Sequence, residues 1–251
     1  MRYKVSMSGG GDLKVLQGND RQRVLVLHRT LGRNSFYSLL FCSVVSLCVL
    51  AARIYISKTH AYMFLAWNLF LAWIPFTCAM WVTVLDKVRP ATRWMLIAPS
   101  CMWLLFFPNA PYIVTDFIHL QRIEPPALWF DIGLLVLFAW TGCFLGVSSL
   151  QMMQSVVRRR IGRIWSWIFV ITTLGLSGVG IYMGRFLRFN SWDILFRPGR
   201  LIGNIFDALA NPLAHQRAIG VSLMFSLFML VCYVTFLSAR RRGPRSRESQ
   251  F

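Results

Sequence analysis

Long apolar runs alternate with short polar segments along most of this chain. Each run is close to the roughly 20 residues that an α-helix needs to cross a bilayer. The pattern therefore predicts an all-α fold, a polytopic transmembrane helical bundle with about six spans. The expected spans are Phe36–Ala52, Ala61–Leu85, Trp94–Phe107, Ala127–Leu150, Ile164–Met183 and Ala218–Ser238.

Basic tails flank the apolar region. The interpretation divides the chain into a mobile cytoplasmic tail over residues 1–35, a transmembrane domain over 36–238 and a second cytoplasmic tail over 239–251. The last loop before the sixth span is long. Within it, apolar residues recur at helical spacing over residues 200–210, which predicts a short amphipathic helix lying on the membrane surface.

Composition agrees with a membrane protein, because 56% of the residues are hydrophobic and only 14% are charged. Soluble domains carry about 25% charged residues. The net charge of +18 raises the possibility of nucleic-acid binding. However, 19 of the 27 Lys and Arg residues lie in the tails and in alternate loops on one side of the predicted spans. This distribution follows the positive-inside rule. It predicts a multi-pass protein of the cell (inner) membrane with both termini cytoplasmic, and no nucleic-acid partner.

The six cysteines all fall inside apolar runs, and none forms a CxxC pair. A thiolate is costly in lipid, so these residues are expected to be small apolar side chains and not metal ligands. His119 has no second histidine nearby in the sequence. The sequence therefore predicts neither a cofactor nor a metal site.

The first polar stretch is FFPNAPYIVTDFIHL, residues 106–120. Its two prolines interrupt the third span, because proline lacks an N–H and disfavours helix in the residue before it. A new helix is expected to begin there, capped by Asn109 or Ala110. Along such a helix Asn109, Tyr112, Asp116 and His119 share one face. Two interpretations stay open: Asp116 and His119 are an acid/base or ligand pair, or they pair locally at the end of a helix.

The second polar stretch is GRFLRFNSWD, residues 184–193. Arg185 and Arg188 lie three residues apart at the end of the fifth span, followed by Asn190 and Asp193. Cations are favourable at a helix C-terminus, and an arginine pair also binds phosphate or carboxylate well. Asp131, near the start of the fourth span, is expected to pair with Arg185 or Arg188. Both stretches and Asp131 are predicted on the outer side, where they would form one site.

Two GxxxG patterns occur, Gly142/Gly146 in the fourth span and Gly180/Gly184 in the fifth. Small residues at this spacing let helices approach closely. They predict that these two helices pack tightly, on each other or in a homo-oligomer or on another membrane protein.

The motifs FFPNAPYIVTDFIHL, WFD before the fourth span and GRFLRFNSWD resemble those of a bacterial membrane protein family, domain of unknown function 1361. The resemblance covers roughly residues 36–238. It implies a six-helix integral membrane protein and gives weight to these motifs, and it implies no particular reaction.

Three classes of function compete. The first is a protein whose outer polar cluster binds an anionic or phosphate-bearing lipid headgroup or a membrane partner. The second is a membrane enzyme acting on a lipid or lipid-linked substrate at the outer leaflet, with Asp116 or His119 as acid/base. The third is a transporter, which is disfavoured because the span centres hold no charge and Asn68 is their only amide. No GxSxG, HExxH or P-loop motif is present.

Overall fold

The computed structural model describes residues 35–88, 94–122, 128–186, 199 and 216–241. The predicted amphipathic helix at 200–210 and nearly all of both tails lie outside these residues. Those described form helices in the order α2 (Phe36–Ser57), α3 (Met63–Val88), α4 (Trp94–Phe106), α5 (Asn109–Tyr112), η1 (Ile113–Arg122), α6 (Leu128–Arg160), α7 (Arg163–Phe186) and α10 (Gln216–Arg241).

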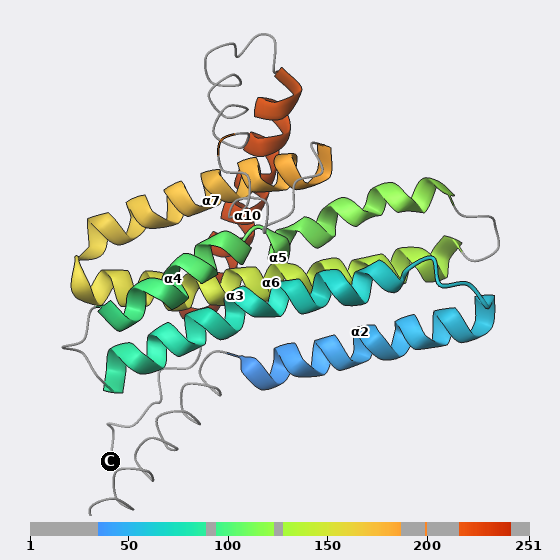
Figure 1. Cartoon of the computed structure of the whole chain (residues 1–251), viewed down its shortest axis with the longest axis horizontal. Coiled ribbons are helices and arrows are strands. Elements are labelled where there is room, and N and C mark those ends of the chain that lie inside the picture. Colours follow the sequence, from blue (N-terminus) through green and yellow to red (C-terminus); the bar gives the residue numbers. More distant parts are fainter. Residues whose placement is uncertain (1–34, 89–93, 123–127, 187–198, 200–215, 242–251) are drawn as a thin grey trace, which may run out of the picture.

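The helices form a bundle in which six segments are long and apolar enough to cross a membrane. In Figure 1, α2 and α7 lie on opposite sides, and α3, α6 and the broken α4–α5–η1 segment lie between them. One end of the bundle holds the C-termini of α2 and η1 and the N-termini of α3 and α6, and α7 runs toward this end but stops short of it. We call it the Asp116 end. The opposite end, where α3 and α6 finish and α7 begins, is the Asp86 end. The predicted all-α fold with six apolar spans is confirmed.

The long helix α6 is the centre of the bundle, since it packs against α2, α3, α5, η1, α7 and α10. Its 33 residues correspond to about 50 Å at 1.5 Å per residue, which exceeds the hydrocarbon thickness of about 30 Å. Asp131 lies in its first turn and three arginines in its last turn. Both charges complement the helix dipole, so the sequence favours helix at each end of α6.

The third span is longer than the sequence predicted. It continues from Trp94 past both prolines to Leu120 instead of ending at Phe107. Pro108 and Pro111 therefore interrupt a span in the middle of the bundle and do not mark its junction with water (Figure 1). Beyond the break the chain runs mainly as a 3-10 helix, Ile113–Arg122, and not as the expected α-helix.

Close packing seats this break between α6 and α7. A β-carbon placed on Gly142 would lie 2.6 Å from the carbonyl oxygen of Ala110, and one on Gly180 would lie 2.8 Å from Cγ of Pro108. Gly146 likewise faces the side chain of Ala110. The glycines predicted to join two helices thus accommodate the broken third span. A homo-oligomer or partner contact through these glycines stays a prediction. Gly142, Gly146 and Gly180 already contact the broken third span within the chain.

The last helix, α10, crosses α7 obliquely (Figure 1). Gly178 permits their contact, because a β-carbon there would lie 2.1 Å from the backbone oxygen of Ser222. The chain itself buries only 11% of the apolar window of α10. The exposed side chains include Leu223, Met224 and Leu227. An apolar groove of about 510 Å³ lies between α10, α6 and η1.

Candidate functional site

A buried carboxylate joins three segments at the Asp116 end. Asp116 in η1 is only 1% exposed, and its Oδ1 accepts a hydrogen bond of 2.5 Å from the Nη2 group of Arg185 in α7. Its Oδ2 accepts a 2.7 Å bond from the side-chain amide of Asn68 in α3. Both carboxylate oxygens are therefore engaged. Such a pair holds its helices together firmly, because removing one partner of a buried ion pair costs about 3–5 kcal/mol.

Arg185 also contacts three other residues of the first polar stretch. Its Nε donates to Oγ1 of Thr115 at 2.9 Å, and its Nη1 lies 3.4 Å from Nε2 of His119. Its guanidinium also lies over the ring of Tyr112, 4.9 Å from the centroid, as a cation–π contact. The structure thus brings Tyr112, Asp116 and His119 together around one arginine of the second stretch.

Local helix geometry contributes to this convergence. A 3-10 helix has three residues per turn, so side chains at i and i+3 eclipse. In η1 this places Asp116 and His119 on the same side, toward α3 and α7. The ring of His119 also contacts the ring of Phe64 in α3, with 4.8 Å between centroids. The neighbouring residues Val114 and Phe117 line the apolar groove against α6 and α10.

Asn109 has a different position from the one expected. It is the first residue of α5 and follows the N-cap residue Pro108, so it does not occupy the predicted N-cap position. Its side-chain amide donates to the carbonyl oxygen of Phe106 at 3.1 Å. This bond satisfies a carbonyl at the end of α4, one of those that a helix leaves without a partner inside the helix. Asn109 therefore contributes to the geometry of the proline break.

The predicted partner of Asp131 is wrong. Asp131 is fully buried and pairs with Arg53 of α2: Nε of Arg53 bonds Oδ1, and Nη2 bonds Oδ2 at 3.0 Å. This bidentate pair ties α2 to the start of α6. The guanidinium of Arg53 also lies 5.8 Å from the ring centroid of Tyr62. Burial, followed by the charge of Asp131, raises the pKa of Tyr62 to about 12.

The second polar stretch is only partly described. Arg188, Asn190 and Asp193 lie outside the described residues, so Arg185 is the described candidate from this stretch at the predicted single site. Within the part of the chain that the structure describes, no group of three or more His, Cys, Asp or Glu could hold a metal ion.

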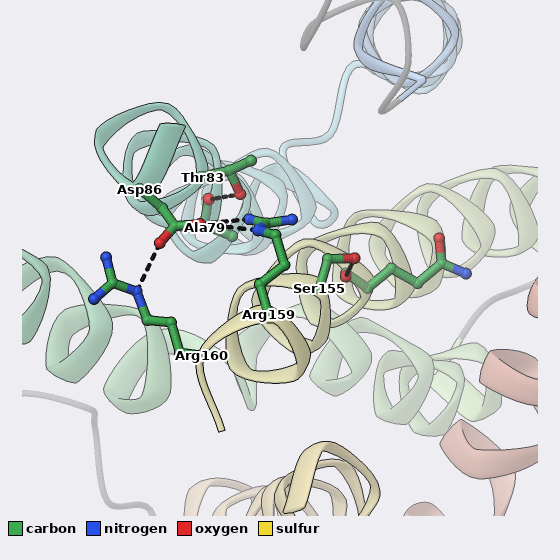
Figure 2. Close-up of polar contacts among 7 residues, drawn as sticks. Ala79, Thr83, Asp86, Ser155, Arg159 and Arg160 are labelled. Carbon is green, nitrogen blue, oxygen red and sulfur yellow. Dashed lines mark hydrogen bonds and ion pairs between the residues drawn. The ribbon is translucent and has the colours of Figure 1, made fainter. Parts of the chain in front are cut away.

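The Asp86 end holds a second charged cluster that the sequence reasoning missed. Asp86 of α3 lies between Arg159 and Arg160 of α6 (Figure 2). Oδ2 accepts bonds from Arg159 Nε at 3.0 Å and Nη2 at 2.6 Å, and Oδ1 accepts one from Arg160 Nε at 2.6 Å. A signal was present, namely an acid closing one apolar run and an arginine run closing another. The arginines also follow the positive-inside pattern, which accounts for them without any pairing.

Comparisons with known proteins give one match. The family model described as "Protein of unknown function (DUF1361)" matches residues 67–232. No curated protein and no solved structure matches the chain.

Proposed function

The chain belongs to this DUF1361 family and carries six apolar spans, and from that premise we propose that it is a cell-membrane protein that binds a phosphate-bearing lipid headgroup at its Asp116 end. Arg185 is the cation of the site, with Tyr112, Thr115 and His119 around it. Both termini are cytoplasmic in this proposal, so the site belongs to the outer leaflet. A transporter is the less favoured class.

The surroundings of Arg185 carry the proposal. Its side chain remains 16% exposed while Asp116 is almost completely buried. Asp116 engages one terminal nitrogen and Thr115 engages Nε. The other terminal nitrogen reaches His119 at 3.4 Å, a long contact that leaves donor capacity on the accessible side. A guanidinium held in this way presents a fixed fork to a phosphate.

The adjacent apolar groove supports a lipid as the ligand in preference to a free anion. Val114 and Phe117 flank Asp116 in η1 and line this groove with residues of α6 and α10. Its volume of about 510 Å³ falls in the range of small-molecule pockets, about 300–1,000 Å³. An acyl chain fits its apolar lining, while the headgroup stays with Arg185 on the other face of η1.

The alternative is a membrane enzyme acting on a lipid or lipid-linked substrate at the outer leaflet. The contact between His119 and Arg185 favours it, since an imidazole beside an anion-binding guanidinium is a common acid/base arrangement. Asp116 is a poor general base here, because both of its oxygens already accept hydrogen bonds. His119 is therefore the residue on which the enzymatic alternative depends.

Lipid binding is tested with the full-length protein in detergent, titrated with dioleoylphosphatidylglycerol and observed by native mass spectrometry. Arg185→Lys keeps the charge but loses the fork, so its affinity should fall by about tenfold. Arg53→Lys is the matched control, because Arg53 also pairs with a buried aspartate at the same end. Equal binding by wild type and Arg185→Lys, or an equal loss in Arg53→Lys, contradicts the proposal.

The enzymatic alternative has its own experiment. Lipids and envelope glycopolymers are compared between cells producing wild type and cells producing His119→Gln. A changed composition, with lipid binding retained in the purified variant, would favour the enzyme. An unchanged composition would leave headgroup binding as the better account of His119.

A further inference from the structure

The cluster at the Asp86 end has more positive charge than its carboxylate neutralises. One buried carboxylate, 7% exposed, accepts hydrogen bonds from two guanidinium groups. Two further arginines lie nearby in the chain: Arg158 precedes Arg159, and Arg163 begins α7. Both are exposed. Asp86 therefore leaves a local excess of positive charge at the junction of α6 and α7.

The carboxylate also fixes the direction of the arginines. Arg159 uses its Nε and Nη2 edge on Oδ2 of Asp86, which leaves its Nη1 group without a partner among the described residues. The Arg159 side chain is 46% exposed. Figure 2 shows Arg159 and Arg160 reaching Asp86 from opposite sides. A guanidinium whose inner edge is tied to a carboxylate has less side-chain entropy to lose when its outer edge binds an anion.

The position of the cluster indicates which anion it meets. Asp86 is the third residue from the end of α3, and Arg159 and Arg160 are the last two of α6, so the cluster lies where two spans meet the headgroup region. The chain reverses there within two residues, with Gly162 at φ 110°. Exposed Ile164 and Trp165 follow directly. Aromatic residues beside arginines at a span end are typical of the membrane interface, and basic pockets between helices bind anionic headgroups.

We infer that Asp86, Arg159 and Arg160 form a binding site for the phosphate of an anionic phospholipid headgroup in the leaflet at the Asp86 end. Arg159 contacts the phosphate with its outer edge, and Asp86 is a positioning residue. This site is independent of the one around Arg185, because it lies at the opposite end of the bundle.

The first experiment compares two neighbouring arginines. Full-length protein in detergent is titrated with dioleoylphosphatidylglycerol, and the retained lipids are counted by native mass spectrometry. Arg159→Gln should weaken one binding event by about tenfold, as expected for the loss of a charge-assisted hydrogen bond. Arg158→Gln removes the same charge from an exposed neighbour and is expected to lose clearly less. Equal losses in the two variants would show only general attraction to basic residues and would overturn the inference.

Asp86→Asn separates general electrostatic attraction from the inferred site, because the two predict opposite changes in the affinity for phosphatidylglycerol. Removing the acid adds one positive charge, so general electrostatics predicts tighter binding of phosphatidylglycerol. The inferred site predicts weaker binding, because Arg159 and Arg160 lose their orientation. Tighter binding in a variant that melts like the wild type contradicts the inference. If Asp86→Asn does not fold, the comparison of Arg159 with Arg158 still decides.

Stoichiometry separates this site from the one proposed around Arg185. With both sites present, Arg159→Gln loses one retained lipid, Arg185→Lys loses another, and the double variant loses both. Dioleoylphosphatidylcholine, whose headgroup has no net charge, should not compete. Competition by equimolar inorganic phosphate would overturn the assignment of the ligand as a lipid.

Discussion

Gly142 of α6 touches the backbone of the broken third span: a β-carbon on Gly142 would lie 2.6 Å from the carbonyl oxygen of Ala110. This separation is too short for any side chain larger than hydrogen. The contact fixes where the proline break sits against α6. It therefore also fixes where η1 begins and how Asp116 reaches Arg185.

Gly142→Ala should lower the free energy of unfolding by about 1–3 kcal/mol, the usual range for overpacking. The matched control is Gly133→Ala in the same helix, where nothing lies within 4 Å of the added carbon. Unfolding in mixed micelles followed by circular dichroism measures both variants. Equal stability of the two would show that the Ala110 contact relaxes without cost.

Gly178→Ala should disturb the contact between α7 and α10, because the new carbon would lie 2.1 Å from the Ser222 oxygen. Backbone cannot shift as cheaply as a flexible side chain, so we expect a loss of about 1–3 kcal/mol or displacement of α10. Gly175→Ala, one turn earlier and with open space around it, is the control. Protease sensitivity near α10, together with melting temperature, reports the change. A Gly178→Ala protein as resistant and as stable as Gly175→Ala would refute the close crossing.

Asp131→Asn should destabilise the protein by about 3–5 kcal/mol, since it leaves the Arg53 guanidinium in a largely buried position without its anion. A double-mutant cycle identifies the partner. The effects of Asp131→Asn and Arg53→Gln should be strongly non-additive, whereas those of Asp131→Asn and Arg185→Gln should add. Coupling of Asp131 to Arg185 instead would restore the sequence-based pairing and contradict the observed one.

The raised pKa of Tyr62 gives a pH prediction. Its pKa is about 12 in the folded protein, against about 10 for a free tyrosine. The unfolded chain therefore releases this proton first, so stability falls as pH rises through the interval between those values. Tyr62→Phe should melt like the wild type at pH 7 and at a higher temperature than the wild type at pH 11. Melting curves of both proteins at the two pH values measure this. If the melting temperatures of wild type and Tyr62→Phe differ by the same amount at pH 7 and pH 11, the raised pKa of Tyr62 is contradicted.

Much of the cluster around Arg185 is predictable from the sequence, because Tyr112, Asp116 and His119 lie in one short stretch. Local spacing alone predicts that Tyr112, Asp116 and His119 share one helix face, and the position of Arg185 at a helix end predicts a cation there. Asn68 is a polar residue inside a predicted span, but its bond to Asp116 joins residues 48 positions apart. Such a pairing depends on which helices are neighbours and on how each is rotated, and local spacing carries neither.

The sequence by itself determined the class of the protein, since apolar runs of the length of a bilayer leave the chain few alternatives to spanning helices. Only the tertiary structure decided which charges meet, as Asp131 with Arg53 and Asp86 with Arg159 and Arg160. The tertiary structure also decided that Gly142 of α6 and Gly180 of α7 pack against the proline break of the third span. The physical reason is that membrane insertion depends on the composition of each segment alone, whereas ion pairs and glycine contacts depend on the packing of segments distant in sequence.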